Sequence, residues 1–270
     1  MYKIIFIDID GTLRNDKKEI TEKTKETIRK TIEKGIYVVI CSGRPTKYVE
    51  EVSKEALASS YVIGCNGGEI YDYKEKKTIC LNALEQGEIM TLWNIAKRYD
   101  VQFSMISNGR RIVKKQTDDE TDILLEEPIE NFIIKNPITQ CVFSSLNLEN
   151  IRNIKEEIND IKNIKIVNLS KCLVNNQLST EKPFFLDITC KDTSKGNAIK
   201  NLCKYLKIDL KDSVAIGDSY NDVTMFEVVG HSVAMGNASE DIKKIVDEVT
   251  DTNNEDGVAK FLEKLNKEVF

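Results

Sequence analysis

The sequence predicts an α/β protein in which a doubly wound parallel sheet is interrupted by an inserted α+β domain. Two observations lead to this prediction. Toward both ends of the 270-residue chain, short β-branched apolar runs alternate with helical patterns, and between about residues 83 and 188 this alternation breaks down. Apolar strands separated by helices are typical of parallel sheets with right-handed crossovers. We therefore expect a core domain made of residues 1–82 and 189–270, with an inserted domain over 83–188.

The first part of the predicted core alternates strictly between strands and helices. Residues 21–35 carry apolar side chains or threonines at helical spacing, and Gly35 suits the end of that helix. The expected order is strand 2–8, helix 21–35, strand 36–43, helix 45–58, strand 61–68 and a hairpin over 69–80.

The insert mixes helices with strands that look antiparallel, and Asn108–Gly109 is a turn signal between two of the strands. Its expected elements are helices over 83–100 and 147–159, with strands over 101–107, 110–115, 139–145, 164–170 and 183–190. The core alternation then resumes with helix 194–206, strand 213–218, helix 220–228, strand 232–236 and helices over 239–246 and 255–267.

The composition indicates an ordinary globular protein and argues against some classes of binding partner. Hydrophobic residues make up 41% of the chain, charged residues 31%, and the formal net charge of −5 argues against a general nucleic-acid or membrane-surface binder. We recognise no leader and no apolar run near the roughly 18 residues of a membrane span, so we expect a cytoplasmic protein. Seven cysteines without a C-x-x-C pair predict buried reduced thiols, at Cys41, Cys65, Cys80, Cys141, Cys172, Cys190 and Cys203.

Two groups of acids follow predicted strands. Asp8 and Asp10 end the first strand two residues apart, so in an extended segment they point the same way. Asp218 and Asp222 follow the strand over 213–218. Ligands of such sheets bind beyond the carboxyl ends of the strands, so both groups are expected at one site. Oxygen ligands in this number suit a hard divalent cation such as Mg²⁺, which would relieve their repulsion.

Other residues at the same edge suit a phosphate group. Lys195, at the start of a predicted helix, supplies positive charge, and Ser42 supplies a hydroxyl group. Turns at Gly11 and Gly43 expose backbone N–H groups to an anion.

Four motifs in order give the chain a family resemblance. They are "DIDGTL" (8–13), "CSGR" (41–44), "TSKGNA" (193–198) and "GDSYND" (217–222). Together they resemble the motifs of the haloacid dehalogenase-like (HAD) hydrolases, and the ordered set is far more specific than one motif alone. The Cof-type sugar-phosphatase branch of that superfamily is similar in "NGG" (66–68), "VAMGNASEDIKKIVDEVT" (233–250) and "NNEDGVAKFL" (253–262). The resemblance covers almost the whole core and implies a Rossmann-like core with an inserted cap.

The resemblance also implies roles for individual residues. Asp8 would be the nucleophile that forms an aspartyl-phosphate, and Asp10 would protonate the leaving group and then deprotonate water. Related ion-pumping ATPases with long-lived phosphoenzymes carry Thr in place of Asp10, so Asp favours a phosphatase or a phosphomutase. Thr12 would fix the loop and phosphate, and Ser42 with Lys195 would bind the phosphoryl group.

Mg²⁺ is the cofactor that the resemblance implies. Its ligands would be the carboxylates of Asp8 and Asp218 and the backbone carbonyl of Asp10. Asp222 would bind it through water or orient Lys195, and Asn221 would act from close by.

Several of these residues also have structural interpretations. Asp-Gly is a common turn, so Asp8 and Asp10 alone would not identify a site. Ser42 and Asn221 are each compatible with a helix cap.

Residues around these motifs leave further alternatives open. Arg44 is either a surface charge or a substrate clamp. Asn66 and Gly67 either face the substrate or turn the chain toward the hairpin. His231, the only histidine, is expected to open a strand, and Trp93 to fill the core of the insert.

These observations predict a Mg²⁺-dependent phosphatase that hydrolyses a small phosphorylated metabolite, such as a sugar phosphate, through an aspartyl-phosphate. The insert would cover the site and exclude large substrates and bulk water. The alternatives are a phosphomutase of the phosphomannomutase type and a phospho-ligand-binding protein without turnover. No nucleic acid or membrane is expected as a partner, and the substrate, the cap residues that select it and the oligomeric state stay open.

Overall fold

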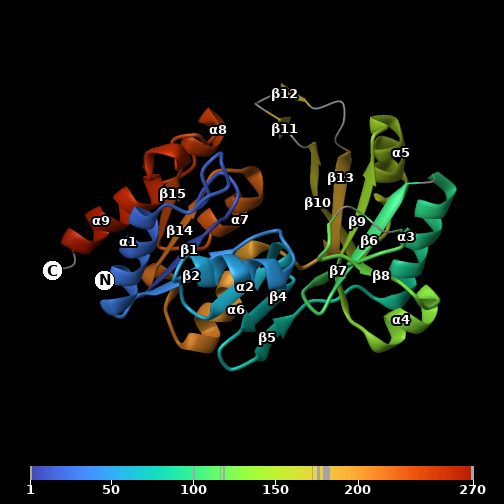
Figure 1. The fold of residues 1–270 in the computed structure, drawn as a ribbon, viewed down its shortest axis with the longest axis horizontal. Coiled ribbons are helices and arrows are strands. Elements are labelled where there is room, and N and C mark those ends of the chain that lie inside the picture. The colour runs from blue at the N-terminus through green and yellow to red at the C-terminus, as the bar shows by residue number, and fades with distance from the viewer. Residues whose placement is uncertain are drawn as a thin grey trace. The chain divides into compact units, whose positions relative to one another are not determined.

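The computed structural model describes residues 2–99, 101–115, 117, 119–171, 173–174, 177–178 and 183–268 (Figure 1). The chain forms two compact units. The core unit comprises Met1–Cys80 and Ser194–Phe270, and the cap unit comprises Leu81–Thr193. The sequence pattern suggested divisions at 82 and 188. The predicted fold class, an α/β core with an inserted α+β unit, is confirmed.

The core unit is built on an eight-stranded sheet in the order β16-β15-β14-β1-β2-β3-β4-β5. The strands from β16 to β3 run parallel, and β3 pairs antiparallel with β4. Chain order switches at β1, and ligands of such sheets bind at the carboxyl edge near a switch of this kind. The strands are β1 (Ile4–Ile7), β2 (Tyr37–Cys41), β3 (Tyr61–Gly64), β4 (Glu69–Asp72), β5 (Lys77–Leu81), β14 (Ser213–Gly217), β15 (His231–Ala234) and β16 (Glu248–Val249). As predicted, His231 opens a strand.

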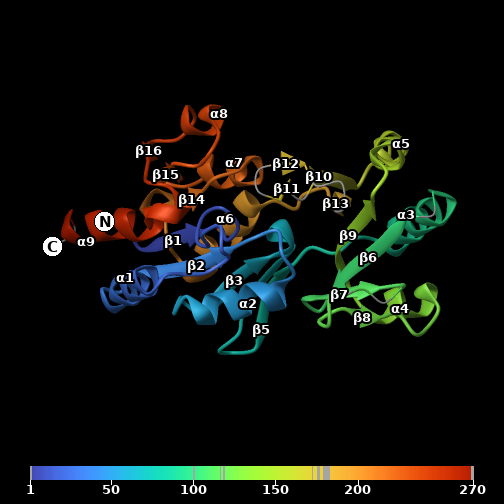
Figure 2. The same cartoon turned by 45° about the horizontal axis from the view of Figure 1, so that its top comes forward.

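Helices cover both faces of the core sheet. One face carries α1 (Glu22–Glu33), α2 (Thr46–Glu55) and α9 (Gly257–Glu268), and the other carries α6 (Lys195–Leu206), α7 (Val223–Phe226) and α8 (Glu240–Lys243). Figures 1 and 2 show α1 and α9 side by side. Along β1, Ile5 and Ile7 pack into one layer while Ile4 and Phe6 pack into the other. All four side chains are buried, which explains why the strand reads as a continuous apolar run.

The cap unit contains a six-stranded sheet in the order β10-β13-β9-β6-β7-β8. Its pairings are antiparallel except that β7 and β8 run parallel. The strands are β6 (Gln102–Ser107), β7 (Arg110–Val113), β8 (Ile123–Leu124), β9 (Ile138–Ser145), β10 (Ile164–Lys171) and β13 (Phe184–Cys190), beside a separate pair of β11 (Leu173–Val174) and β12 (Gln177–Leu178).

Three helices of the cap unit bury their apolar sides in one cluster with this sheet, namely α3 (Gln86–Tyr99), α4 (Ile129–Lys135) and α5 (Leu148–Ile158). Trp93 of α3 meets Phe103 of β6 edge to face, with ring centroids 5.7 Å apart. Trp93 therefore fills the core of this unit, as its helical spacing predicted.

Short elements are where the sequence-based prediction was wrong. The helix α4 and the strands β8 and β16 were not expected, because elements of two to seven residues carry too little periodic pattern. The helices expected over 220–228 and 239–246 shrink to α7 and α8, of four residues each. The end of the predicted helix over 83–100 falls on Asp100, which lies outside the described residues.

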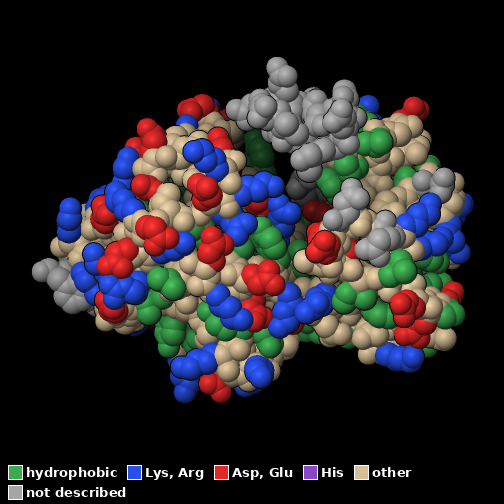
Figure 3. Space-filling view, in the orientation of Figure 1, with side chains coloured by type: hydrophobic (Ala, Val, Ile, Leu, Met, Phe, Trp, Pro, Cys, Tyr) green, Lys and Arg blue, Asp and Glu red, His purple; other side chains and the backbone are tan. Residues whose placement is uncertain are grey.

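The surface carries charges of both signs (Figure 3), and the described cysteines are free. The six cysteines that the structure describes are free thiols, and Cys172 lies outside the described residues. Four of the six are buried as predicted, whereas Cys80 and Cys190 are only half-buried. Figure 3 shows Lys and Arg side chains intermixed with Asp and Glu side chains on the face drawn. Along α1 this mixing produces ion pairs between Lys25 and Glu22 and between Arg29 and Glu26. No described helix has the length and apolar character needed to cross a membrane.

Candidate active site

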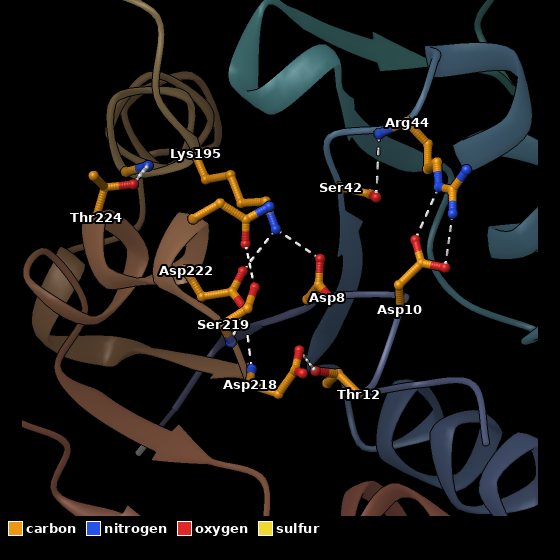
Figure 4. Close-up of polar contacts among 12 residues, drawn as sticks. Asp8, Asp10, Thr12, Ser42, Arg44, Lys195, Asp218, Ser219, Asp222 and Thr224 are labelled. Carbon is orange, nitrogen blue, oxygen red and sulfur yellow. Dashed lines mark hydrogen bonds and ion pairs between the residues drawn. The ribbon is translucent and has the colours of Figure 1, made fainter. Parts of the chain in front are cut away.

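Polar residues follow four neighbouring strands of the core sheet. Asp8 comes after β1, Ser42 after β2, Asn66 after β3 and Asp218 after β14. The four strands are parallel neighbours, so their carboxyl ends meet at one edge. Lys195 is the first residue of α6, which begins there because Ser194 accepts a hydrogen bond from the N–H of Asn197. Figure 4 shows Lys195 reaching toward Asp8 and Asp222.

Lys195 is held between two carboxylates from distant parts of the chain. Its Nζ lies 2.6 Å from Oδ1 of Asp8 and 2.6 Å from Oδ1 of Asp222. The three residues are only 1%, 4% and 0% exposed, respectively, so the ammonium group has exchanged water for these partners. Burial alone would lower the pKa of Lys195, but the carboxylates of Asp222 and Asp8 raise it above its ordinary value. Lys195 is therefore a permanent positive charge beside Asp8.

The turn after β14 explains how Asp222 reaches Lys195. Asp222 Oδ2 accepts hydrogen bonds from the backbone N–H groups of Asp218 at 3.0 Å and Ser219 at 3.1 Å. Ser219 and Asp222 form a capping box at the 3₁₀ turn Tyr220–Asp222. Both oxygens of Asp222 are thus occupied, and the geometry favours orienting Lys195 over direct metal ligation.

Negative charge exceeds positive charge at this edge. Burial raises the pKa of Asp8 well above the ordinary carboxyl value although Lys195 opposes the rise, and the carboxylates of Asp222 and Asp218 add to it. Burial and the Asp222 carboxylate raise the pKa of Asp218 to about 7. One ammonium group does not balance the carboxyl groups of Asp8 and Asp222, which are buried, and of Asp218, which is half-buried; a further cation would do so.

The residues present fit a divalent metal ion. Asp8, Asp218 and Asp222 each have an oxygen within one cluster whose atoms all lie within 4.8 Å of one another. Among the described residues, nothing donates to Oδ2 of Asp8 or Oδ2 of Asp218. A side chain on Gly11 (φ +81°) would collide with the second of these oxygens, so glycine keeps that space open. An all-oxygen donor set suits Mg²⁺.

Asp10 is not part of this carboxylate cluster. Its Oδ2 lies 2.9 Å from Nε of Arg44 and its Oδ1 lies 3.1 Å from Nη2, which is a two-point ion pair. Both side chains are about half exposed, and Figure 4 shows Asp10 pointing toward Arg44 rather than toward Asp8. The sequence offered a surface charge or a substrate clamp for Arg44, and neither interpretation anticipated this pair.

Thr12 and Ser42 lie on either side of Asp8. Thr12 Oγ1 donates to Asp218 Oδ1 at 3.1 Å, which joins the loop after β1 to the end of β14. The Ser42 side chain is 2% exposed, and its Oγ accepts from the backbone N–H of Arg44 at 3.3 Å. The helix-cap interpretation of Ser42 is wrong, because α2 begins after Pro45 without a side-chain cap.

The segment after β3 is strained and tightly packed. Cys65, Asn66 and Gly67 have successive positive φ angles of 53°, 56° and 98°. The N–H of Asn66 donates to the Ser42 carbonyl at 3.1 Å, and a Cβ on Gly43 would lie only 2.7 Å from Oδ1 of Asn66. A Cβ on Gly67 would collide with the carbonyl of Ser194. The segment therefore lies between the Ser42 loop and the start of α6.

Asn221 does not cap a helix, so that interpretation is wrong. The cap of the turn is Ser219, and Asn221 Oδ1 accepts from Ser219 Oγ at 2.6 Å. Asn221 is thus joined to the turn that carries Asp222.

Sequence reasoning missed a group of residues that hold the loop after β1. Asp16 was assigned no role, but its carboxylate accepts from Asn253 Nδ2 at 3.1 Å and Asn254 Nδ2 at 2.9 Å. These two hydrogen bonds lower the pKa of Asp16, with Asn254 contributing more. Asn237 donates to the carbonyl of Gly11. The sequence did contain a signal. All three asparagines lie in the two C-terminal motifs at 233–250 and 253–262, but no contacts were predicted for them.

Comparison with known proteins gives the class of this molecule. A family model described as haloacid dehalogenase-like hydrolase matches residues 5–262. The chain belongs to the haloacid dehalogenase-like hydrolases, as the motifs predicted. Within that family it is a phosphatase enzyme, the class shared by its curated relatives.

Two curated relatives from Bacillus subtilis (strain 168) are named for the same activity. The 5-amino-6-(5-phospho-D-ribitylamino)uracil phosphatase YcsE is 30% identical over 263 residues, covering 96% of this chain and 94% of its own. The phosphatase YwtE, named for the same compound, is 28% identical, covering 97% and 98%. A solved haloacid dehalogenase-like hydrolase from Bacteroides thetaiotaomicron matches with a TM-score of 0.84 at 27% identity, covering 98% of this chain and 100% of that one.

Proposed function

We propose that this protein is a Mg²⁺-dependent phosphatase that hydrolyses a small phosphomonoester through an aspartyl-phosphate on Asp8. The proposal rests on the different surroundings of the two oxygens of the Asp8 carboxylate. Lys195 holds Oδ1 at 2.6 Å, and no described residue donates to Oδ2. A carboxylate fixed at one oxygen and open at the other, beside a buried positive charge, suits attack on an anionic phosphoryl group.

In the first step, Oδ2 of Asp8 attacks phosphorus and the bond from phosphorus to the leaving oxygen breaks. The leaving alkoxide takes a proton from Asp10, so the products are an alcohol and an acyl phosphate. Lys195 stabilises the negative charge of the transferring oxygens. The Ser42 hydroxyl accepts a hydrogen bond from the Arg44 N–H and keeps its own proton free to donate to one of these oxygens.

In the second step, Asp10 takes a proton from water, and the water oxygen attacks phosphorus. The bond between phosphorus and Asp8 breaks, which releases phosphate and restores the carboxylate. Both steps require Asp10 to face the phosphoryl group. Because Asp10 is bound to Arg44, exchange of that ion pair for a contact with substrate belongs to the proposed cycle.

The carboxylates of Asp8 and Asp218 and the backbone carbonyl of Asp10 would hold Mg²⁺. When bound, the ion supplies positive charge that offsets the phosphoryl oxygens and the surrounding acids. Asp222, with both oxygens already occupied, keeps Lys195 in place and orders the turn that carries Asp218. Thr12 holds the other oxygen of Asp218.

We propose a small phosphorylated metabolite as the substrate. Two relatives named for a phosphorylated ribityl compound support a phosphorylated polyol or sugar chain as the substrate class. That compound is therefore the first candidate to test.

The test is a screen of phosphomonoesters with and without Mg²⁺. It should include 5-amino-6-(5-phospho-D-ribitylamino)uracil, hexose phosphates and polyol phosphates, with Asp8→Asn as the control variant. We expect one molecule of inorganic phosphate per alcohol formed, loss of activity with EDTA, and at least about a thousandfold loss in Asp8→Asn.

Each failure has a distinct meaning. Dependence on a bisphosphate activator, with transfer instead of release, would replace hydrolysis by the phosphomutase reaction. Full activity of Asp8→Asn would exclude the covalent mechanism. Binding of phosphate esters without turnover would support a phospho-ligand-binding protein instead.

A further inference from the structure

Asn237 joins two segments of the core unit that lie far apart in the sequence. Its Nδ2 donates to the carbonyl of Gly11 at 2.8 Å, and its Oδ1 accepts from the backbone N–H of Asn253 at 2.9 Å. Gly11 belongs to the loop after β1, between Asp10 and Thr12, and Asn253 opens the 3₁₀ turn that precedes α9. One carboxamide therefore bridges the loop of the expected nucleophile and the C-terminal segment.

The C-terminal segment also binds this loop at a second place. Asn253 Nδ2 donates to the carbonyl of Arg14 at 3.1 Å and to Asp16 Oδ1 at 3.1 Å. Asn254 exchanges two hydrogen bonds with Asp16, one in each direction, at 2.9 and 3.0 Å. The loop is thus fixed at Gly11 by Asn237 and again at residues 14–16, and the Asn237 contact is the one next in the chain to Thr12, which binds Asp218.

The position of Gly11 determines the space around Asp218. The backbone of Gly11 lies so close to the Asp218 carboxylate that no side chain fits between them. The next residue, Thr12, donates to Asp218 Oδ1 at 3.1 Å. Asn237 binds the carbonyl oxygen of the peptide bond between Gly11 and Thr12. Because a peptide bond is planar, this hydrogen bond also fixes the orientation of the Thr12 backbone, from which the Thr12 side chain reaches Asp218.

Asn237 itself contributes nothing to the apolar core. Its side chain is exposed, and its two contacts are both to backbone groups. Exposed hydrogen bonds of this kind contribute little to stability. Asn237 therefore does little for folding, but it binds the backbone carbonyl between Asp10 and Thr12. This contact indicates that its role is to position the loop.

We propose that Asn237 is a positioning residue for the loop after β1, which it holds so that Thr12 and Asp218 keep the geometry needed to bind the divalent cation. This inference rests on the proposed function, because it assigns a purpose to the Asp218 carboxylate. It extends the site to a residue outside the four motifs that bear the expected catalytic groups.

The test compares Asn237→Ala and Asn237→Asp with Asn254→Ala in the full-length protein. Asn237→Asp keeps the acceptor for Asn253 but sets a carboxylate oxygen against the Gly11 carbonyl. Asn254→Ala is the matched control, because it is an exposed asparagine whose contacts end at Asp16. Three quantities are measured for each variant: amide hydrogen exchange in overlapping peptides that resolve residues 9–13 from residues 14–16, the rise in melting temperature with Mg²⁺, and kcat with KM.

Both Asn237 variants should exchange faster over residues 11–13, and their Mg²⁺-dependent rise in melting temperature should need several times more Mg²⁺. Their kcat should fall about tenfold, which is roughly the rate equivalent of one positioned hydrogen bond, with KM nearly unchanged. Asn254→Ala should match the wild type in Mg²⁺ dependence and kcat.

Wild-type exchange and Mg²⁺ dependence in both Asn237 variants would overturn the inference, even if their melting temperatures fell. A fall in kcat alone, without a change in exchange, would also overturn it. If the wild-type protein hydrolyses no phosphomonoester, the proposed function fails, while exchange and Mg²⁺-dependent melting still decide the role of Asn237.

Discussion

The guanidinium group of Arg44 binds both carboxylate oxygens of Asp10, at 2.9 and 3.1 Å, and holds that carboxylate apart from the Asp8 cluster. Arg44 itself follows β2 by only a few residues, so its own backbone is anchored to the sheet. Its N–H donates to Ser42 Oγ and its carbonyl accepts from Cys65. In the proposed mechanism, the ion pair therefore fixes the position of the Asp10 carboxylate before substrate binds.

Replacing Arg44 tests whether this waiting position matters. Arg44→Ala should lower kcat about tenfold, because a half-exposed Asp10 without its partner samples several rotamers. Arg44→Lys should recover only part of the loss, since an ammonium group cannot bind both oxygens in the same planar way. Steady-state kinetics with the best substrate of the screen measures both. An Arg44→Ala enzyme as fast as the wild type would show that Asp10 needs no such anchor.

Lys195→Met should strongly destabilise the metal-free protein, by about 3–5 kcal/mol, because Asp8 and Asp222 lose their shared counter-charge in a buried site. The control is Lys3→Met, which removes an exposed ion pair with Asp212 and should destabilise the protein far less, because water screens that pair. Urea unfolding at pH 8 without Mg²⁺ gives both values. Equal losses in the two variants would mean that burial adds nothing to the value of the Lys195 contacts.

The pKa of Asp218, about 7, predicts the pH dependence of stability in the absence of metal. Between the ordinary carboxyl pKa and pH 7, the folded protein keeps a proton that the unfolded chain releases, so stability falls as pH rises through this window. Melting temperatures of the wild type and Asp218→Asn at pH 5 and pH 8, without Mg²⁺, isolate this contribution. The wild type should lose more stability than Asp218→Asn on going to pH 8.

Added Mg²⁺ should reverse that loss, because a cation that binds only the folded state stabilises it and competes with the proton for the same oxygens. The rise in melting temperature with Mg²⁺ should be larger at pH 8 than at pH 5. A rise that is equal at both values, or that persists in Asp218→Asn, would place the cation elsewhere.

Gly11→Ala should impair cation binding beyond its effect on the backbone. The substitution puts a Cβ into the Asp218 carboxylate and also strains a residue with φ of +81°. Gly35→Ala is the matched control, because Gly35 has φ of +83° but open space around the new Cβ. Both variants should lose about 1 kcal/mol in urea unfolding from strain. Only Gly11→Ala should need more Mg²⁺ for half-maximal activity, and an equal requirement in both would refute the collision.

The parts of the site that lie at strand ends could be predicted from the sequence. Asp8, Ser42 and Asp218 each follow a run of apolar residues, and the parallel order of such runs brings their ends to one edge. Lys195 could be placed because it starts a helix of the same α/β alternation. These predictions needed only local pattern and the handedness of the crossovers.

Contacts between loops could not be predicted in the same way. Asp16 and Asn254 are separated by almost the whole chain, and nothing in the local pattern of either loop indicates that they meet. The pairing of Arg44 with Asp10 depends on the rotamers of two half-exposed side chains. The helix α4 follows Pro128 and spans a single short segment, so its apolar residues show no clear period.

Every site residue described above lies in the core unit, and none lies in Leu81–Thr193. The chain leaves the core unit at the end of β5 and returns just before α6. The cap unit is therefore joined by only two chain connections to the core unit, which carries all of these residues. This division allows the two parts to evolve at different rates. If the insert selects the substrate, as we propose, grafting the insert of a relative onto this core should change which phosphomonoester is hydrolysed while the residues of the active site stay the same.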